Sequence, residues 1–265
     1  MSRNAPPQHA IDLSCDAGEA STPEDRDVER ALLELVTSVN IACGGHTGDE
    51  HSMRAAVEAA LEHACTIGAH PSYPDREGFG RRHFPMKPKD LESTLCEQIE
   101  ALINIAAQSN ATVAHIKPHG TLYHDASHDP RITEVVANAA LACSGDLRLV
   151  GPAHAPCLRI WQGMGIRCIT EGFVDRVYEQ NGSLRSRSMP DALITDPADA
   201  ARQALRIATE QSVLLDDGTQ LALRADTLCF HSDTPGALAV ARKVAEALRA
   251  SGVRLRPICE TDHTK

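Results

Sequence analysis

Short apolar runs of strand length alternate along the chain with longer segments whose apolar residues recur at helical spacing. The apolar runs cover residues 9–15, 39–43, 66–69, 112–116, 147–150, 167–170, 227–230 and 253–257. The predicted helices cover residues 23–36, the segment after Asp49, 88–106, 131–142, 197–210 and a last segment capped by Thr234 and opened by Pro235. This alternation is typical of parallel strands joined by helical crossovers.

The segments that follow the strands decide between two α/β architectures. A doubly wound nucleotide-binding sheet carries a glycine fingerprint or a P-loop after its first strand, and neither follows residues 9–15. The pattern therefore favours a parallel β/α barrel, in which the loops after the strands converge on one face.

Composition narrows the class of protein further. A chain of 265 residues suits one α/β barrel, so we expect a single domain over residues 9–265 behind a disordered leader at residues 1–8. The net charge of -10 and the aromatic content of 3% argue against nucleic acid and anionic membranes as main partners. No apolar run has the length of a membrane span, and the first ten residues lack the apolar core of a signal peptide. We therefore expect a cytoplasmic protein.

Ionisable side chains gather at the predicted carboxyl ends of the strands. Each has an ordinary explanation on its own, as a loop carboxylate, a surface lysine or a structural histidine. Their shared position after apolar runs argues against independent explanations, because a barrel brings these positions to one face. We expect one site that contains Asp16, Glu19, His46, Asp49, His70, Lys117, His119, Glu171, Asp175, His231 and Asp233.

The stretch from residue 39 to residue 49 shows the arrangement and its alternative. An apolar run leads into a glycine-rich turn around His46, and Asp49 is positioned to cap the helix that follows. A helix cap beside a solvated histidine explains this stretch equally well. Only the recurrence of the same arrangement at other strands favours a functional site.

Carboxylates, imidazoles, a lysine and arginines in one pocket suit activation of water next to a polarised carbonyl. The cations would hold a carboxylate or a phosphate. The His and Asp side chains could equally hold a divalent metal, although no helix carries the paired-histidine motif of zinc hydrolases. The 9 cysteines suggest neither a disulfide framework nor a zinc knuckle, and Cys43 and Cys229 are expected to point into packed strand layers.

Long motifs follow four of the predicted strands. They are Asn40-Ile41-Ala42-Cys43-Gly44 with His46, Gly48 and Asp49, then Ile67-Gly68-Ala69-His70-Pro71 with Gly78-Phe79-Gly80-Arg81, then Lys117-Pro118-His119-Gly120-Thr121-Leu122-Tyr123, then Asp175-Arg176 with Tyr178, Gly182-Ser183-Leu184 and Arg187. From Ile11 to Val253 the chain resembles the lactam-utilisation family of the LamB/YcsF type. Its characterised members are the A subunits of the bacterial ATP-dependent 5-oxoprolinase.

The resemblance implies a seven-stranded parallel β/α barrel of the glycoside hydrolase and deacetylase type. It also implies cleavage of 5-oxoproline, or a related small lactam, to L-glutamate coupled to hydrolysis of ATP, with Mg²⁺ accompanying the ATP. The partners implied are separate B and C subunits. Whether this subunit itself binds ATP or a divalent metal stays open.

Two sets of site residues are predicted on this basis. The catalytic set is Asp16, Glu19, His46, Asp49, His70, Lys117, His119, Asp175 and His231. The substrate-binding set is Asn40, Arg81, Tyr123, Glu171, Arg176, Arg187 and Asp233.

The chain departs from the family pattern at three places. Ser14-Cys15-Asp16-Ala17-Gly18-Glu19 stands where Asn-Ala-Asp-Leu-Gly-Glu is usual, and His231-Ser232-Asp233 stands where His-Gly-Asp is usual. Gly45 replaces a phenylalanine before the turn histidine, and we expect this change to widen the pocket.

Three functions remain in view. The first is the A subunit of an ATP-dependent 5-oxoprolinase, in which Lys117 and the arginines steady negative charge and Asp16, His46 or His70 serves as base. The alternative is a metal-dependent deacetylase or amidase that needs no ATP. The third is a non-catalytic subunit that presents a ligand to partners. The isolated chain is expected to hydrolyse 5-oxoproline little or not at all.

Overall fold

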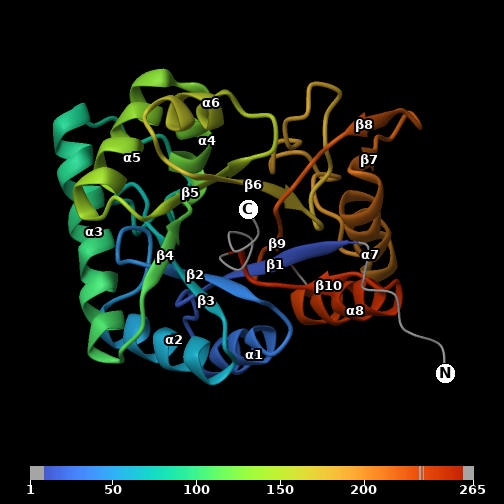
Figure 1. Cartoon of the computed structure of the whole chain (residues 1–265), viewed down its shortest axis with the longest axis horizontal. Helices are drawn as coiled ribbons and strands as arrows, with labels where there is room; N and C mark the ends of the chain where they lie inside the picture. The colour runs from blue at the N-terminus through green and yellow to red at the C-terminus, as the bar shows by residue number, and fades with distance from the viewer. Residues whose placement is uncertain (1–8, 233, 235, 259–265) are drawn as a thin grey trace.

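The computed structural model describes residues 9–232, 234 and 236–258, and it contains a closed parallel barrel (Figure 1). The barrel strands are β1 (Ala10–Ala17), β2 (Ser38–Ala42), β3 (Thr66–His70), β4 (Val113–Ile116), β5 (Arg148–Pro152), β6 (Cys168–Phe173) and β9 (Thr227–Phe230). Each strand pairs in parallel with the next, and β9 pairs with both β6 and β1 to close the ring. The predicted seven-stranded β/α barrel is confirmed.

Helices surround the barrel, and most begin where a Pro, Thr or Asp favours a helix start (Figure 1). Asp49 caps α2 by accepting from the Ser52 amide, as its position suggested. Among the described residues, no helix is long and apolar enough to cross a membrane. The helices are α1 (Pro23–Leu33), α2 (Glu50–Glu62), α3 (Pro88–Gln108), α4 (Gly120–His128), α5 (Pro130–Cys143), α6 (Pro156–Gly163), α7 (Pro197–Leu205), which a π-helical turn (Arg206–Glu210) continues, and α8 (Ala237–Ala250).

Alternate residues of the strands face the lumen of the barrel. Lys117, just after β4, contacts Asp16 of β1, and His115 of β4 contacts Asn40 of β2. These strands are not neighbours in the sheet, so the contacts run through the lumen. The inward positions of β1, β2 and β4 that make these contacts are therefore polar.

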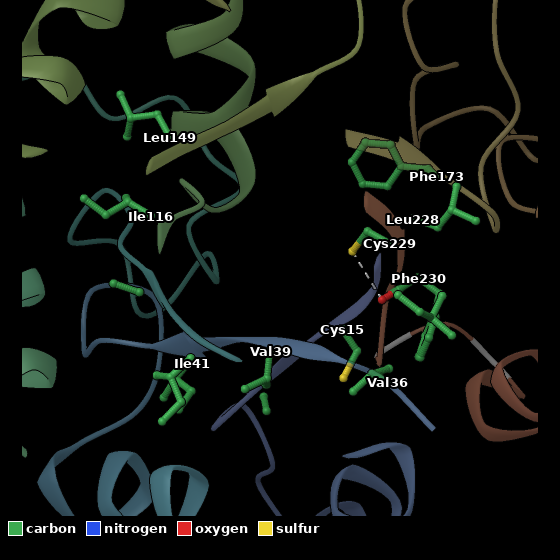
Figure 2. Close-up of a cluster of buried hydrophobic side chains, with 14 of the residues drawn as sticks. Cys15, Val36, Val39, Ile41, Ile116, Leu149, Phe173, Leu228, Cys229 and Phe230 are labelled. Carbon is green, nitrogen blue, oxygen red and sulfur yellow. Dashed lines mark hydrogen bonds between the residues drawn. The ribbon is translucent and has the colours of Figure 1, made fainter. Parts of the chain in front are cut away.

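The outward-facing side chains form the main hydrophobic core with the helices. Leu13 and Cys15 of β1, and Val39 and Ile41 of β2, are fully buried and belong to one cluster with Leu32 of α1. Figure 2 shows Val39 and Ile41 on the side of β2 that faces the helices. Burying each such leucine, isoleucine or valine contributes about 1.5–3 kcal/mol, so this layer stabilises the barrel.

Some elements differ from the sequence prediction. Helices α4 and α6 were not predicted, because each is short and its apolar face is interrupted. A hairpin of β7 (Ser212–Leu214) and β8 (Gln220–Ala222) lies inside a segment without a predicted strand. The last predicted strand is reduced to β10 (Arg254–Leu255), which pairs with the start of β1.

The predicted start of the last helix was wrong. Helix α8 begins at Ala237 with Gly236 as its N-cap, and Thr234 instead donates its hydroxyl to Asp175 Oδ2 at 2.9 Å. The Thr234 hydroxyl therefore donates to the buried Asp175 carboxylate and does not cap the helix as the sequence suggested. Pro235 and the expected leader at residues 1–8 lie outside the described residues.

Candidate active site

A buried lysine joins several strands at the carboxyl end of the barrel. The Lys117 ammonium lies 2.9 Å from Asp16 Oδ1, 3.3 Å from Glu171 Oε1 and 3.1 Å from Cys229 Sγ. Burial by itself lowers the pKa of Lys117, but Asp16, Cys229 and Glu171 together outweigh this effect and the pKa is raised well above its usual value. Lys117 is therefore a fixed positive charge inside the barrel.

Asp16 is held in place by a chain of hydrogen bonds across the lumen. Asn40 Nδ2 donates to Asp16 Oδ1 at 2.9 Å, and His115 Nε2 donates to Asn40 Oδ1 at 2.8 Å, which orients the amide. Burial raises the pKa of Asp16, but His70 and Lys117 outweigh it and leave that pKa well below its usual value. Asp16 is thus an ionised carboxylate at neutral pH.

His115 fits into the lumen because the neighbouring strand has no side chain at Gly68. A Cβ atom at Gly68 would lie only 2.0 Å from His115 Nε2. Burial lowers the pKa of His115 to about 3, so its ring is neutral and donates through one nitrogen. Gly68 and His115 are therefore positioning residues for Asn40 and, through it, for Asp16.

Glu171 lies within β6 and not at its exit, where the sequence suggested it. Tyr123 donates its hydroxyl to Glu171 Oε2 at 2.5 Å, and Glu171 Oε1 faces Lys117 at ion-pair distance without hydrogen-bond alignment. One ammonium thus balances two carboxylates, those of Asp16 and Glu171. Tyr123 and Glu171 were both predicted to bind substrate. In the structure Glu171 lies next to Lys117, and Tyr123 contacts Glu171.

A second group of side chains, which we call the histidine cluster, consists of Glu19, His46, His70 and His119. These four come from the exits of β1, β2, β3 and β4, and all three imidazoles are buried. His46 Nε2 lies 3.0 Å from Glu19 Oε1, and His119 Nδ1 lies 2.9 Å from His70 Nε2. The rings of His46 and His119 stack with centroids 3.6 Å apart. The cluster adjoins Asp16, whose Oδ2 is 3.4 Å from His70 Nε2.

Burial keeps two rings of the histidine cluster neutral. It lowers the pKa of His46 to about 4. Burial, followed by the proximity of His70 and His46, lowers the pKa of His119 far below its usual value. Neutral imidazoles have a free lone pair, which can accept a proton or bind a metal. The four side chains of the cluster offer ligand atoms that all lie within 4.8 Å of one another.

Asp175 and His231 form a separate pair on the far side of Lys117. The buried Asp175 carboxylate accepts from the backbone N–H of His231 and lies 3.0 Å from its Nδ1. Burial raises the pKa of Asp175, but His231 and the hydroxyl of Thr234 hold it below the usual value. Phe173 stacks on the His231 ring, with centroids 5.4 Å apart, and its own ring centroid lies 5.8 Å from Lys117 Nζ.

Three arginines lie together outside these buried groups. Arg176 is buried and donates to the carbonyl oxygen of Arg185, and burial lowers its pKa to about 10. The positive charges of the exposed Arg81 and Arg187 also lower the pKa of Arg176. We call these three arginines the positive rim; guanidinium groups of this kind can bind a carboxylate or a phosphate.

Two predicted site residues are not part of this arrangement. Asp49 is exposed and caps α2, so the ordinary explanation of that stretch holds for Asp49, whereas His46 is buried in the histidine cluster. Asp233 lies outside the described residues.

Several contributing residues were not predicted from the sequence. Glu29 of α1 accepts from the backbone N–H groups of Gly18 and Glu19, and burial raises its pKa to about 7. Phe79 offers its carbonyl oxygen to His119 Nε2. Cys229 was expected in a packed strand layer, but its sulfur accepts from Lys117 in the lumen. Alternation along β9 puts Thr227 and Cys229 on one face, and this pattern could have identified Cys229 as a residue of the lumen.

Gly45, which stands in place of the phenylalanine, leaves no free space beside Lys117. A Cβ atom at Gly45 would lie 2.4 Å from both Ser72 Oγ and Gln98 Oε1, so those side chains fill the position. A hollow of about 250 Å³ lies next to Gly44 and Gly45 and is lined by Pro74, Thr94 and Gln98. The space is therefore found toward α3 and not beside Lys117.

Another hollow among the described residues lies at the opposite end of the barrel. It measures about 660 Å³ and is lined by residues at the amino ends of the strands, including Asp12, Arg148 and Asp226. In β/α barrels the chemistry is found at the carboxyl ends of the strands. The ionisable groups around Lys117, and not this hollow, therefore mark the candidate active site.

Comparisons with known proteins agree across nearly the whole chain. The LamB/YcsF family matches residues 11–263. A protein of Chloroflexus aggregans, named as the A subunit of 5-oxoprolinase, is 44% identical over 93% of this chain and 98% of its own length. The protein of the same name from Methylococcus capsulatus is 43% identical over 92% of this chain and 94% of its own length.

Solved structures support the fold. The crystal structure of the lactam utilization protein from Thermus thermophilus superposes with a TM-score of 0.87 and 39% identity, covering 93% of this chain and 99% of that one. The Xyl-CE4 domain of a multidomain xylanase from the hindgut metagenome of Trinervitermes trinervoides superposes with a TM-score of 0.52 at 10% identity, covering 95% of this chain and 88% of that one. The second similarity shows a shared fold only.

Proposed function

The chain belongs to the LamB/YcsF family, and from that premise we propose that it is the A subunit of an ATP-dependent 5-oxoprolinase. The substrate is 5-oxoproline, and the product is L-glutamate. Ring opening consumes one water molecule, and hydrolysis of ATP to ADP and phosphate consumes a second. Mg²⁺ accompanies the ATP, and separate B and C subunits complete the enzyme.

The observation that carries the proposal is the Lys117 ammonium held between two carboxylates at the carboxyl end of the barrel. A lactam is a resonance-stabilised amide, and attack on its carbonyl carbon moves negative charge onto the carbonyl oxygen. A fixed cation in a buried site stabilises that charge, an effect worth about 3–4 kcal/mol where a single such donor has been removed. The two relatives named for 5-oxoprolinase, at 43% and 44% identity, support the same substrate.

The activating step uses ATP. Transfer of the terminal phosphoryl group to the lactam oxygen makes the ring carbon open to attack by water. Asp16, with His70 beside it, takes the proton from that water, and the ring C–N bond then breaks while its nitrogen gains a proton. Ring opening in this way gives γ-glutamyl phosphate, and a second water molecule hydrolyses its acyl–phosphate linkage to release L-glutamate and inorganic phosphate. Arg81, Arg176 and Arg187 supply the positive rim for the carboxylate of 5-oxoproline or for phosphate.

Reconstitution tests this function. The chain is mixed with its B and C subunits, 5-oxoproline, ATP and Mg²⁺, and glutamate and ADP are measured in the same samples. We expect both products only when all three subunits and ATP are present, and little or no turnover by the chain alone. Equal turnover without this chain would reduce its role to binding at most.

The deacetylase or amidase alternative is tested in the same experiment. A panel of acetylated sugars and simple amides is offered to the isolated chain without ATP. Robust hydrolysis there, with no glutamate from the reconstituted complex, would favour that alternative and contradict the proposed function.

A further inference from the structure

We propose that Glu19, His46, His70 and His119 together bind one divalent transition-metal ion of the Zn²⁺ type. The four side chains approach one another from four different strand exits, and their ligand atoms lie within 4.8 Å. This inference goes beyond the proposed function, because ATP-dependent ring opening does not itself require a metal on this subunit.

The outer nitrogens of two rings show where their protons are. His70 Nδ1 lies 2.7 Å from the carbonyl oxygen of Lys117, and His119 Nε2 lies 3.0 Å from the carbonyl oxygen of Phe79. A carbonyl oxygen only accepts hydrogen bonds, so both outer nitrogens must donate. The inner nitrogens, His70 Nε2 and His119 Nδ1, then face each other at 2.9 Å, and both lie within 4 Å of Glu19 Oε1.

Two ring nitrogens at this distance need a proton or a metal ion to bridge them. A proton on His70 Nε2 would bridge to His119 and adjoin Asp16 Oδ2 at 3.4 Å, but within the cluster it would join His70 and His119 alone. A metal ion would also engage Glu19 Oε1, which lies 3.0 Å from His46 Nε2, 3.7 Å from His119 Nδ1 and 3.9 Å from His70 Nε2. One ion therefore accounts for the convergence of all four groups, whereas one proton accounts for two.

The spacing fits tetrahedral coordination. An ion with bonds of about 2.0 Å separates its ligand atoms by roughly 3.3 Å. Four of the separations within the cluster, from 2.9 to 3.9 Å, lie on either side of that value, and all four ligand atoms lie within 4.8 Å of one another. Small side-chain rotations would bring all four atoms into coordination.

The groups around the cluster hold the ligands in orientation. Histidines that bind metals usually donate their second N–H to a backbone carbonyl or a carboxylate, as His70 and His119 do here. Glu29 fixes the loop of Glu19 by accepting from its backbone N–H at 2.9 Å. The His46 ring is clamped between the stacked His119 ring and the edge contact of Phe79.

The donor set selects the kind of ion. Three imidazoles and one carboxylate suit Zn²⁺ and its first-row neighbours, whereas Mg²⁺ and Ca²⁺ prefer oxygen ligands. Asp16 Oδ2 lies 3.4 Å from His70 Nε2, so the ion would adjoin the proposed base. With four protein ligands a tetrahedral ion has no open position, so its main effect would be to hold these strand exits next to Asp16.

The test measures metal and not turnover, so its failure is distinct from failure of the proposed function. Untagged full-length chain is stripped with a chelator, titrated with Zn²⁺ against a chromophoric competitor, and analysed for bound zinc after gel filtration. We expect about one tightly bound Zn²⁺ per chain, and at least a roughly 10-fold weaker affinity in His70→Ala and in His119→Ala.

The matched control is the double variant His124→Ala/His128→Ala. These two exposed histidines of α4 stack on each other and form the other close histidine pair among the described residues. The control should bind Zn²⁺ as the wild type does. Zinc lost with this pair, and kept in His70→Ala, would assign the binding to the surface and overturn the proposal.

Two wild-type measurements decide the matter even if the cluster variants fail to fold. Zn²⁺ should raise the melting temperature of the stripped protein, and Co²⁺ in its place should give the visible absorption bands of a tetrahedral site with nitrogen ligands. A melting temperature that does not change on addition of Zn²⁺, together with far less than one bound Zn²⁺ per chain, would contradict the metal site. The cluster would then hold a shared proton.

Discussion

The outward and inward faces of the same barrel strands are equally buried, but they differ in polarity and in the contacts that their side chains make. On β1 the outward residues Leu13 and Cys15 pack against the helices, while the inward residues Asp12 and Asp16 lie among polar side chains of other strands. All four are at most 5% exposed. Burial alone therefore does not separate structural residues from functional ones in this fold.

What separates the faces is the energetic consequence of losing a partner. An outward leucine interacts with many carbon atoms, and its loss leaves a cavity that lowers stability without changing any charge. An inward carboxylate depends on one or two specific partners, and removing a partner leaves a buried charge uncompensated. The inner face thus carries the chemistry, and the outer face carries most of the stability.

The largest effect is expected at Lys117, because this inward residue contributes both to the chemistry and to the stability. Lys117→Met should lower turnover by about 10²- to 10³-fold, because the proposed oxyanion loses its cation. It should also lower the free energy of unfolding by about 3–5 kcal/mol, because Asp16 and Glu171 lose their shared counter-charge. Steady-state rates of the reconstituted enzyme and urea unfolding of the same variant check both values. A variant with normal stability would mean that one of these carboxylates takes up a proton instead.

Leu13→Ala should act on stability alone. Leu13 is fully buried on the outer face of β1, next in sequence to the inward Asp12. Its truncation should lower the free energy of unfolding by about 2–5 kcal/mol. Turnover per folded molecule should stay at the wild-type level, measured well below the melting temperature. A selective loss of turnover would show that the outer face also shapes the site.

The buried Asp12 on the inner face makes the free energy of unfolding of the protein depend on pH. Burial raises the pKa of Asp12 from 3.8 to about 6, against hydrogen bonds from Ser38, Thr227 and Thr37. A carboxyl group whose pKa is raised by folding stabilises the fold while protonated, so its contribution is complete below pH 3.8 and is lost as the pH rises through about 6. The size is about 3 kcal/mol.

Comparing Asp12→Asn with the wild type isolates this contribution. Urea unfolding between about pH 4 and pH 7 should show the wild type losing stability relative to the variant as the pH rises. Parallel curves for the two proteins would show that Asp12 has the same pKa folded and unfolded.

The smallest effect is expected at Asp49, which belongs to neither face. Asp49→Ala removes the cap of α2 and should lower the melting temperature slightly, because the Ser52 amide loses its acceptor. Turnover of the reconstituted enzyme should be unchanged. A large loss of turnover with normal melting would restore Asp49 to the catalytic set.

The sequence predicts the outer face better than the inner one. Apolar runs mark every barrel strand, because outward side chains must be apolar to pack against helices. Asp16, His46, His70 and Lys117 could also be predicted as site residues, because each is an ionisable residue at the exit of a strand. The missed elements are the short helices α4 and α6 and the β7–β8 hairpin, and α4 begins directly after the site residue His119.

The sequence could not reveal pairings between distant strands. His115 is an ordinary polar residue of a short strand until the barrel closes and brings it to Asn40. Asp49 and His46 share one turn, yet one is exposed as a cap and the other is buried in the histidine cluster. Thr234 looks like a helix cap, and only the position of Asp175 shows that its hydroxyl serves that carboxylate.

The most direct test of the division between the faces is the turnover per folded molecule of Asp16→Asn, measured with its melting curve on one preparation in the presence of the B and C subunits. Asn keeps the size of Asp and can accept from Lys117, while Glu171 still balances the lysine charge, so we expect a stability loss within about 2 kcal/mol. Turnover should fall by about 10²- to 10⁴-fold, because Asn accepts no proton. Near-normal turnover in the folded variant would contradict the account and reduce Asp16 to a structural partner of Lys117.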